Sequence, residues 1–248
     1  MFQVCRVCKV WPVLMRVSVI LGLNQRKSLG KMPSKGVRVS RQQPQPPKVR
    51  RRPLQSRAQA TSQALQDAFV RLVIEQGYER TTVREVAAVA GVGLGTFYEY
   101  FGNMDTLAAM CIHRQVQTLH AQGLQTLQGC AGMAPATRVD RLLDTLVDGI
   151  AREAPMWAAL FMLERKVSAP EPFRRHYQAY VQLWAMALQD CDPPLPEPAQ
   201  PLARLLHTMT YGWVSQSLLA LGPQQTPQQL REPLGWAIHA LLRKAQAA

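Results

Sequence analysis

The chain has 248 residues, which is enough for one large or two modest domains with a buried core. Its net charge of +13 is unevenly placed: the first 57 residues hold fourteen basic and no acidic side chains, and the rest sums to −1. The apolar stretch 10–23 is too short to span a membrane, and no signal-peptide cleavage site follows it. These features argue against a membrane-spanning or secreted protein.

Residues 1–57 are predicted to form a disordered basic leader. Residues 24–57 are rich in Gln, Pro, Lys and Arg and nearly lack large apolar side chains, so they cannot bury enough surface to fold. One interpretation is an arm that lies against DNA phosphates, with Arg57 making a defined contact. The other is a translated upstream stretch without a role, in which case Met32 is a candidate for the true start.

The five cysteines show no disulfide framework, which is typical of a reducing cytoplasm. Cys5 and Cys8 have the spacing of half a zinc site, but no second Cys or His pair lies near them. His113 and His120 share a helical face without acidic partners at ligand spacing. We therefore expect neither a metal nor a cofactor, and no catalytic constellation is visible at local spacing.

Two short helices stand at the centre of the pattern. Apolar residues at helical spacing predict a helix over 83–90, and a second one over 94–100 follows a turn at Gly91-Val-Gly93. Two short helices joined by a Gly-containing turn predict a helix-turn-helix. Such a unit places its second helix in the major groove of DNA.

The flanks of this unit also have helix signals. A helix is predicted over 63–76 with Gly77 after it, and Thr82 with Glu85 gives the spacing of a capping box. Asn103 is the expected N-cap of the next helix. Three helices are expected to bury one apolar set together: Phe69, Val73, Val86, Ala90, Val92 and Phe97.

A series of residues falls in the order and spacing of a known family over about fifty positions: Gly77-Tyr78, Thr81-Thr82-Val83, Ala87, Ala90-Gly91-Val92, Gly95-Thr96-Phe97-Tyr98, Tyr100-Phe101 and Leu107. With them the chain resembles the N-terminal DNA-binding domain of the TetR/AcrR family of bacterial transcriptional regulators. The resemblance implies a homodimer, a helical C-terminal domain, and loss of DNA binding when a small molecule binds. We expect a DNA-binding domain over 58–104 and a ligand-binding and dimerisation domain over 105–248.

Candidate DNA contacts lie on and around the second short helix. Thr96 is the candidate base contact, its alternative being a solvated helix residue. Tyr98 and Tyr100 resemble phosphate-facing aromatics of the family, and the alternative is that one of them packs inward. Gly93 and Leu94 depart from the family, which often has Ser then Lys there. The full set is Arg57, Thr82, Arg84, Gly93, Leu94, Gly95, Thr96, Tyr98 and Tyr100.

The glycines between Gly91 and Gly95 are superficially similar to a phosphate-binding loop. That loop requires a strand before the glycines, whereas a helix is predicted here, so a nucleotide site is disfavoured. A glycine inside a helix costs about 1 kcal/mol relative to alanine. We interpret Gly95 as a position where the backbone approaches another surface, such as DNA.

The C-terminal part is predicted to be entirely helical, which makes the fold class all-α. The prolines of 192–198 are its clearest break, and the helix after them is apolar nearly all round, as expected of a helix buried on several sides. The resemblance implies that the last two helices pair with their symmetry mates in a dimer. The helices are expected at 103–128, 136–152, 156–167, 173–189, 201–221 and 227–245.

Aromatic side chains in the helices 156–167 and 173–189 are candidates to line a pocket for a small apolar or amphipathic ligand. Ordinary core packing is their alternative role. Glu164, Arg165 and His176 are the polar residues that could orient such a ligand. The aromatic candidates are Trp157, Phe161, Tyr177, Tyr180 and Trp184.

Three functions are compatible with these features. The leading one is a dimeric, ligand-responsive transcriptional repressor that binds a pseudo-palindromic, double-stranded operator. The second is a nonspecific nucleic-acid-binding protein driven by the basic leader. The third, an enzyme with a helical fold, would need a catalytic constellation that the sequence does not display.

Overall fold

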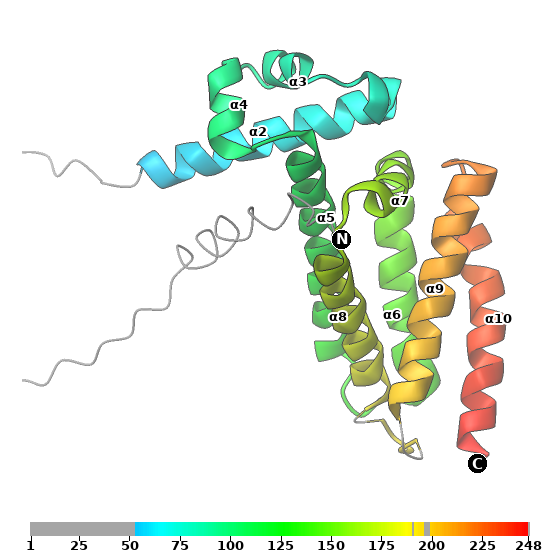
Figure 1. The fold of residues 1–248 in the computed structure, drawn as a ribbon. Coiled ribbons are helices and arrows are strands. Elements are labelled where there is room, and N and C mark those ends of the chain that lie inside the picture. Colours follow the sequence, from blue (N-terminus) through cyan, green and yellow to red (C-terminus); the bar gives the residue numbers. More distant parts are fainter. Residues whose placement is uncertain (1–52, 190, 196–198, 248) are drawn as a thin grey trace, which may run out of the picture. The chain divides into compact units, whose positions relative to one another are not determined.

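A computed structural model describes residues 53–189, 191–195 and 199–247. The secondary structure of these residues consists of helices, without strands (Figure 1). This confirms the predicted fold class. Residues Pro53–Ala248 pack as one unit. Within it the helices are α2 (Pro53–Gln76), η2 (Tyr78–Arg80), α3 (Val83–Val89), α4 (Leu94–Tyr100), α5 (Met104–Gln128), α6 (Pro135–Ala151), α7 (Ala154–Val167), α8 (Pro170–Leu188), α9 (Ala199–Leu221) and α10 (Pro227–Gln246).

The leader expected over 1–57 falls, for residues 1–52, outside the described part of the chain. Helix α2 begins at Pro53, ten residues before the start expected at 63, so residues 53–57 are helical. Proline is well suited to the first turn of a helix, because the amide it lacks has no intrahelical partner there. The helical spacing of apolar residues begins near Leu65, because only the part of α2 from there onward packs on other helices. This spacing therefore does not indicate where α2 begins.

The helices α2, α3 and α4 form the predicted helix-turn-helix, with Phe69, Val86 and Phe97 completely buried between them. Thr82 caps α3: its hydroxyl accepts from the Glu85 amide at 3.3 Å, and the Glu85 carboxylate accepts from the Thr82 amide at 2.8 Å. The capping box is therefore confirmed. Ala90 and Val92, expected in this core, are only partly buried.

The turn between α3 and α4 depends on Gly91, which has φ of 70°. This left-handed conformation is strained for other residues. It lets the Val92 amide donate to the Ala87 carbonyl at 2.9 Å, so a carbonyl at the C-terminal end of α3 has a hydrogen-bond partner. The direction of α4 is thus set by the turn and by the burial of Phe97 beneath it.

Helix α5 runs from the helix-turn-helix into the C-terminal bundle (Figure 1). Its N-cap is Asn103, whose side chain accepts from the Thr106 amide at 2.8 Å. At Gly123 a Cβ would lie 2.8 Å from a methyl group of Leu183 and 3.0 Å from one of Leu142. Only glycine fits there without a shift, so α5 packs closely against both α6 and α8.

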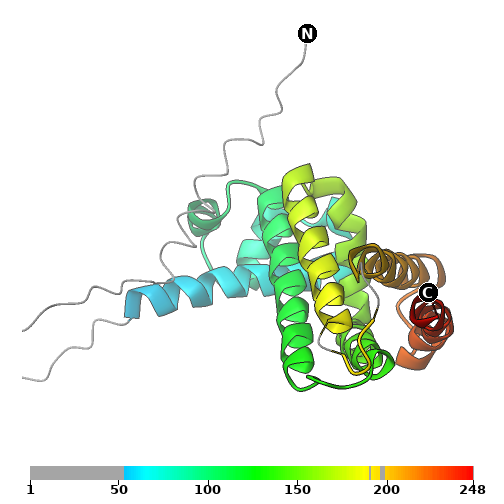
Figure 2. The ribbon, with the colours of Figure 1, turned by 90° about the horizontal axis from the view of Figure 1, so that it is seen from below.

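The C-terminal bundle is formed by α5 to α10. Helix α8 lies between α5 and α9, and α10 lies on the outer side against α6 and α9 (Figures 1 and 2). Pro170 opens α8 at its first position, so the break expected over 168–172 is shorter than predicted. No helix in the described residues combines the length and apolar character needed to cross a membrane.

Arg138 ties two helix ends together inside the bundle and is buried despite its charge. Its guanidinium donates to the carbonyls of Cys130 at 2.5 Å, Met186 at 2.7 Å and Ala187 at 3.1 Å. Cys130 lies just beyond the end of α5, and Met186 and Ala187 belong to the last turn of α8. Carbonyls at helix ends have no partner in their own helix, so a cationic donor there is favourable.

Candidate functional site

Helix α4 has one face buried in the core and one face, called the free face below, that is exposed to solvent. Phe97 is buried and Phe101 follows it into the core, whereas Tyr98 is 55% exposed and Leu94 is also exposed. Thr96 is half-buried. A Cβ on Gly95 would meet no protein atom within 4 Å, so the fold does not require glycine at this position.

The other predicted DNA contacts differ in how far their side chains are exposed and free of partners. Arg57 and Arg84 are exposed. Thr82 is also exposed, but its hydroxyl already lies 2.8 Å from the Glu85 carboxylate. Tyr100 is half-buried and packs against the core, so of the two tyrosines Tyr98 is the one that is presented to solvent.

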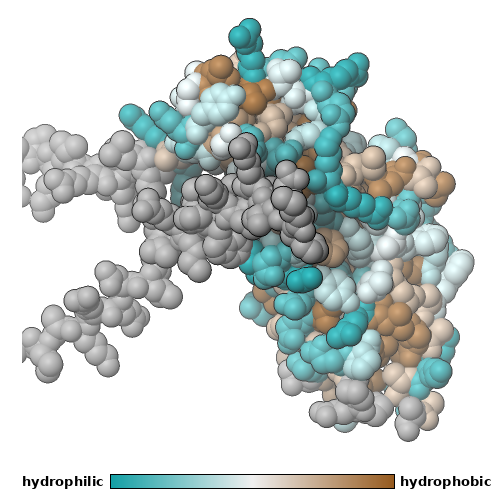
Figure 3. All heavy atoms as spheres, viewed as in Figure 1, coloured by the Kyte–Doolittle hydropathy of each residue, from teal (hydrophilic) through white to brown (hydrophobic). Residues whose placement is uncertain are grey.

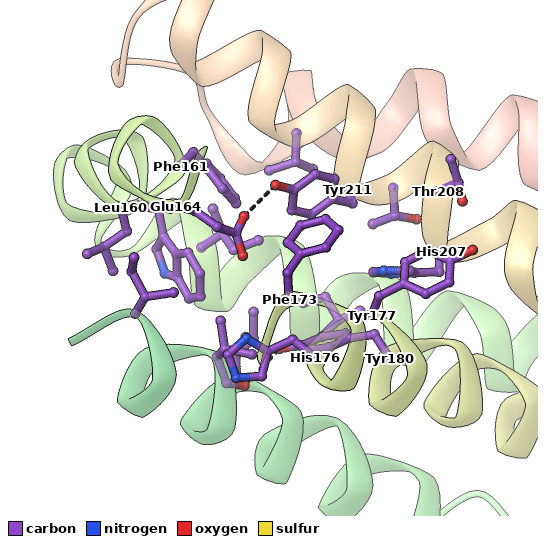
Figure 4. Close-up of a pocket in the computed structure, with 18 residues that line it drawn as sticks. Leu160, Phe161, Glu164, Phe173, His176, Tyr177, Tyr180, His207, Thr208 and Tyr211 are labelled. Atoms are coloured by element: carbon purple, nitrogen blue, oxygen red, sulfur yellow. Dashed lines mark hydrogen bonds between the residues drawn. The ribbon is translucent and has the colours of Figure 1, made fainter. Parts of the chain in front are cut away.

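A cavity of about 280 Å³ lies within the C-terminal bundle (Figure 4). Its walls come from α5, α6, α7, α8 and α9, and most of its surface is apolar. Four of the five aromatic candidates line it, namely Trp157, Phe161, Tyr177 and Tyr180. The other lining residues are Ile112, Val116, Leu119, Leu146, Ile150, Leu160, Glu164, Phe173, His176, His207, Thr208, Thr210, Tyr211 and Val214.

Trp184 is the one aromatic candidate that does not line this cavity. Its side chain is completely buried and is not part of the cavity wall. It follows Tyr180 by four residues and Tyr177 by seven, so the three share one face of α8, and Trp184 lies farther along the bundle where that face is packed. Periodicity shows which residues are buried but does not distinguish a packed core from a cavity wall.

Glu164 is the acidic residue of the cavity wall and is only 7% exposed. One of its oxygens accepts a 2.5 Å hydrogen bond from the Tyr211 hydroxyl (Figure 4). Burial raises the pKa of Glu164, and this effect exceeds the opposing ones of the Tyr211 hydrogen bond and the nearby charge of Arg165. Arg165 itself is exposed and does not line the cavity.

Two histidines complete the polar part of the wall. Burial lowers the pKa of His207 to about 4, and its ring lies against the rings of Tyr177 and Tyr180 at centroid distances of 5.1 and 5.6 Å. Burial, followed by the charges of His113 and Arg175, lowers the pKa of His176 to about 4. Both imidazoles are therefore neutral at pH 7.

The contribution of α9 to the cavity was missed from the sequence. Tyr211, His207 and Thr208 project from it toward the residues of α7 and α8 (Figure 4). An apolar helix near the C-terminus was assigned to dimerisation alone. The signal available was the interruption of its apolar character by His207, Thr210 and Tyr211 at helical spacing.

One stretch of α5 serves both the cavity and the helix-turn-helix. Ile112 and Val116 line the cavity. Between them, Arg114 donates to Asp67 of α2 at 2.9 Å. The His113 ring lies 3.0 Å, between nitrogens, from His176 of α8. Residues 111–116 of α5 therefore join α2, α8 and the cavity.

Helix α7 makes a second junction with the helix-turn-helix. Lys166, in its last turn, forms an ion pair with Glu79 of η2 and lies 4.8 Å above the ring centre of Tyr78. The Tyr78 hydroxyl in turn donates to Asp105 at the start of α5. The helix that supplies Trp157, Phe161 and Glu164 thus also contacts the segment between α2 and α3.

Large apolar side chains are exposed along the last two helices. Figure 3 shows brown, hydrophobic surface over α9 and α10. Trp236 of α10 is 68% exposed, and Leu205, Trp213 and Leu221 of α9 are exposed as well. Contiguous apolar surface of this kind typically marks a protein–protein contact.

Comparison with known proteins identifies the helix-turn-helix region. Residues 65–111 match the family model described as "Bacterial regulatory proteins, tetR family". No curated protein matches the sequence. The match spans α2 to the first turns of α5, the same region whose residues carry the resemblance.

Solved structures match the whole described fold. A TetR-family transcription regulator from Marinobacter aquaeolei VT8 has 19% identity and a TM-score of 0.56, covering 75% of this chain and 98% of its own. A transcriptional regulator from Rhodococcus sp. Rha1 has 22% identity, TM-score 0.56 and coverage of 75% and 98%. FadR from Bacillus subtilis, solved in complex with stearoyl-CoA, has 16% identity, TM-score 0.57 and coverage of 73% and 97%. At these identities the structures show a shared fold, and together with the family model they confirm the resemblance.

Proposed function

We propose that the chain, whose residues 65–111 match the model of bacterial regulatory proteins of the tetR family, is a ligand-responsive transcriptional repressor. The observation that carries the proposal is the arrangement around α5. An exposed recognition helix lies at one end of this helix, and an apolar cavity lies against its middle. The proposal divides the described chain into a DNA-binding domain up to about residue 104 and a ligand-binding and dimerisation domain from 105 onward.

DNA binding is assigned to the free face of α4. With Phe97 anchored in the core, Thr96 and the backbone at Gly95 face a major groove, and Tyr98 contacts phosphate. Arg84 of α3 and Arg57 of α2 are exposed cations, and we assign to them the sequence-independent part of the binding. The protein acts in the cytoplasm, has double-stranded operator DNA as its partner, and is assigned no catalytic activity.

The operator is pseudo-palindromic in this proposal because the protein binds as a homodimer. Two-fold dimers present two recognition helices to successive major grooves, roughly 34–36 Å apart. The exposed side chains of Trp213 and Trp236 on α9 and α10 support a dimer contact along these helices. Pairing them with a symmetry mate removes this apolar surface from water.

Release by a ligand follows from unequal affinity. A small molecule in the cavity weakens operator binding only if it binds the DNA-incompetent conformation more tightly. A hundredfold loss of operator affinity needs about 2.7 kcal/mol of coupling, and the operator must weaken ligand binding by the same factor. The junctions of Arg114 with Asp67 and of Lys166 with Glu79 are the contacts through which the two sites meet.

The test uses DNA from the region flanking the protein's own gene. Footprinting identifies the protected site, and titrations at several salt concentrations then compare it with a scrambled duplex of equal length. We expect a specific site with at least a thousandfold preference, since specific binders typically exceed their nonspecific affinity by that much or more. Equal affinity for both duplexes with a steep salt dependence would instead establish the alternative, a nonspecific nucleic-acid-binding protein.

A further inference from the structure

The electrostatic character of the cavity is set by one carboxylate. The residues of its wall include Glu164 but no Lys or Arg. Its two imidazoles have a pKa of about 4 and are uncharged at pH 7. A ligand therefore meets an apolar, largely aromatic wall that carries one carboxyl group and, among its lining residues, no Lys or Arg.

Glu164 is also without an ion pair in the described part of the chain. It is 93% buried, accepts a hydrogen bond from Tyr211, and has no basic group within salt-bridge distance. Arg165 is the basic residue that acts on it through space, and Arg165 points to solvent from the last turn of α7. Buried carboxylates in proteins are normally paired, because removing the charge from water is costly.

The rest of the wall suits the apolar body of such a ligand. Aromatic rings from three helices line the cavity, among them Trp157 and Phe161 from α7, Tyr177 and Tyr180 from α8 and Tyr211 from α9. The faces of these rings carry partial negative charge and attract cations. Figure 4 shows Phe173 between the Glu164–Tyr211 pair and the group formed by Tyr177 and His207.

We propose that the cavity binds a lipophilic organic cation, whose positive group lies beside the Glu164 carboxylate and whose apolar body contacts the aromatic wall. The inference rests on the proposed function, because it names the chemical class of the effector. The volume of about 280 Å³ suits a molecule of one or two rings. An anionic effector is disfavoured, because it would bring a like charge to Glu164 without a basic partner in the wall. The stearoyl-CoA of FadR belongs to that anionic class.

The experiment compares three probes of nearly equal shape on the full chain without DNA. Biphenyl-4-ylmethylamine is a cation at pH 7, biphenyl-4-ylmethanol is neutral, and biphenyl-4-carboxylate is an anion. Affinities are measured by isothermal titration calorimetry. We expect the amine to bind at least tenfold more tightly than the alcohol. The ratio of the affinity of the amine to that of the carboxylate should be larger still. Tenfold corresponds to about 1.4 kcal/mol.

Two matched variants locate the preference. Glu164→Gln removes the charge but keeps a side-chain oxygen for the Tyr211 hydroxyl, and it should abolish the tenfold preference for the amine. Glu153→Gln makes the same charge change at an exposed residue at the N-terminus of the same helix, and the preference should stay. Helical content measured by circular dichroism establishes that each variant is folded.

Several results would overturn the proposal: no binding of the amine, a preference below tenfold in the wild-type protein, or a preference that survives in folded Glu164→Gln. If Glu164→Gln does not fold, the wild-type ratio alone decides. Because no DNA is present, the two proposals fail separately. If the protein prefers its operator but does not prefer the amine, the regulator proposal stands and the effector proposal fails. If the protein binds the amine through Glu164 but has no operator preference, the effector proposal stands and the regulator proposal fails.

Discussion

The proposed DNA interface assigns a base contact and a phosphate contact to two different residues of α4. Thr96→Ala removes a short hydroxyl at a half-buried position of the recognition helix. We expect the ratio of operator to nonspecific affinity to fall by an amount equivalent to about 1–3 kcal/mol, the usual size of a lost base contact. Fluorescence anisotropy with operator and scrambled duplexes measures both affinities in one series.

Tyr98→Phe is the matched variant for phosphate binding. It keeps the exposed ring of α4 and removes only the hydroxyl. Affinity should fall by a similar factor for both duplexes, since phosphate contacts carry no sequence information. An unchanged specificity ratio in folded Thr96→Ala would show that this side chain does not read a base.

His207 makes the stability of the fold depend on pH. Its side chain is 8% exposed, and burial lowers its pKa from 6.5 to about 4. The unfolded chain therefore binds a proton at higher pH than the folded chain, so stability is lost as pH falls from about 6.5 to about 4. The loss approaches about 3 kcal/mol at the lower limit, from about 1.4 kcal/mol per unit of pKa difference.

Urea unfolding at a series of pH values tests this contribution. The difference in unfolding free energy between wild type and His207→Gln should shrink by up to about 3 kcal/mol as the pH falls from 7 to 4. His176 titrates in the same range in both proteins, so it cancels from the difference to a first approximation. A difference independent of pH would show that His207 is protonated equally in both states.

Residue-level features were predictable from the sequence where they depend on local spacing. The capping box of Thr82 and Glu85 and the cap at Asn103 involve residues three apart, and both are present. The contact between Tyr211 and Glu164 joins residues 47 positions apart. Glu164 is predicted from the sequence as a residue that could orient a ligand, but no local pattern encodes its pairing with Tyr211.

At the scale of helices, the bundle depends on the link that Arg138 makes between α5 and α8. Arg138→Met keeps the apolar stem but removes the guanidinium that donates to the carbonyls of Cys130, Met186 and Ala187. The Cys130 carbonyl keeps the Met133 amide as a donor at 3.3 Å, so we expect a loss of about 1–3 kcal/mol in unfolding free energy, the usual cost of a buried polar group that loses its partner. Chemical denaturation measures this loss.

Arg141→Met is the control for that substitution. Arg141 lies one turn further along α6 with its side chain exposed. The same change of chemistry there should alter stability by less than about 0.5 kcal/mol, as surface substitutions usually do. Equal losses in the two variants would mean that the carbonyl contacts of Arg138 do not stabilise the fold.

Helix positions followed the apolar period closely, and the disagreements lie at the ends. Helix α8 begins at Pro170 where 173 was expected, and α2 begins at Pro53 where 63 was expected. From the sequence, 168–172 is expected to be a break and residues up to 57 are expected to belong to the leader, although proline is compatible with the first turn of a helix. Where a helix ends depends on how its terminal amide and carbonyl groups find hydrogen-bond partners. The spacing of apolar residues carries no information about those partners.

At the scale of the whole molecule, the exposed surface of α9 and α10 predicts the assembly. Trp236→Glu places a charge on a side chain that is 68% exposed, so the fold of the monomer should tolerate it. In the dimer the charge would be buried, and we expect the dissociation constant to rise at least tenfold. Sedimentation velocity over a range of concentrations measures this change.

Met162→Glu provides the comparison for the assembly. Met162 is a similarly exposed apolar residue of α7, outside the surface of α9 and α10. It should leave the dimer unchanged. A wild-type protein that is monomeric at micromolar concentration, or a dimer equally weakened by both variants, would contradict the assignment of the interface.

The stretch 111–116 of α5 determines how far a change in the cavity must travel. Ile112 and Val116 touch the cavity, while Arg114 holds Asp67 of α2. These residues lie within two turns of one helix, so the two contacts are separated by about a helix diameter, roughly 10 Å, and not by the length of α5. A rotation of α5 about its own axis would change both contacts at once. If the proposed effector binds in the cavity, the shortest route from it to the DNA-binding domain runs across α5 and not along it. Substitutions that stiffen the far end of α5 should then leave the response to the effector intact.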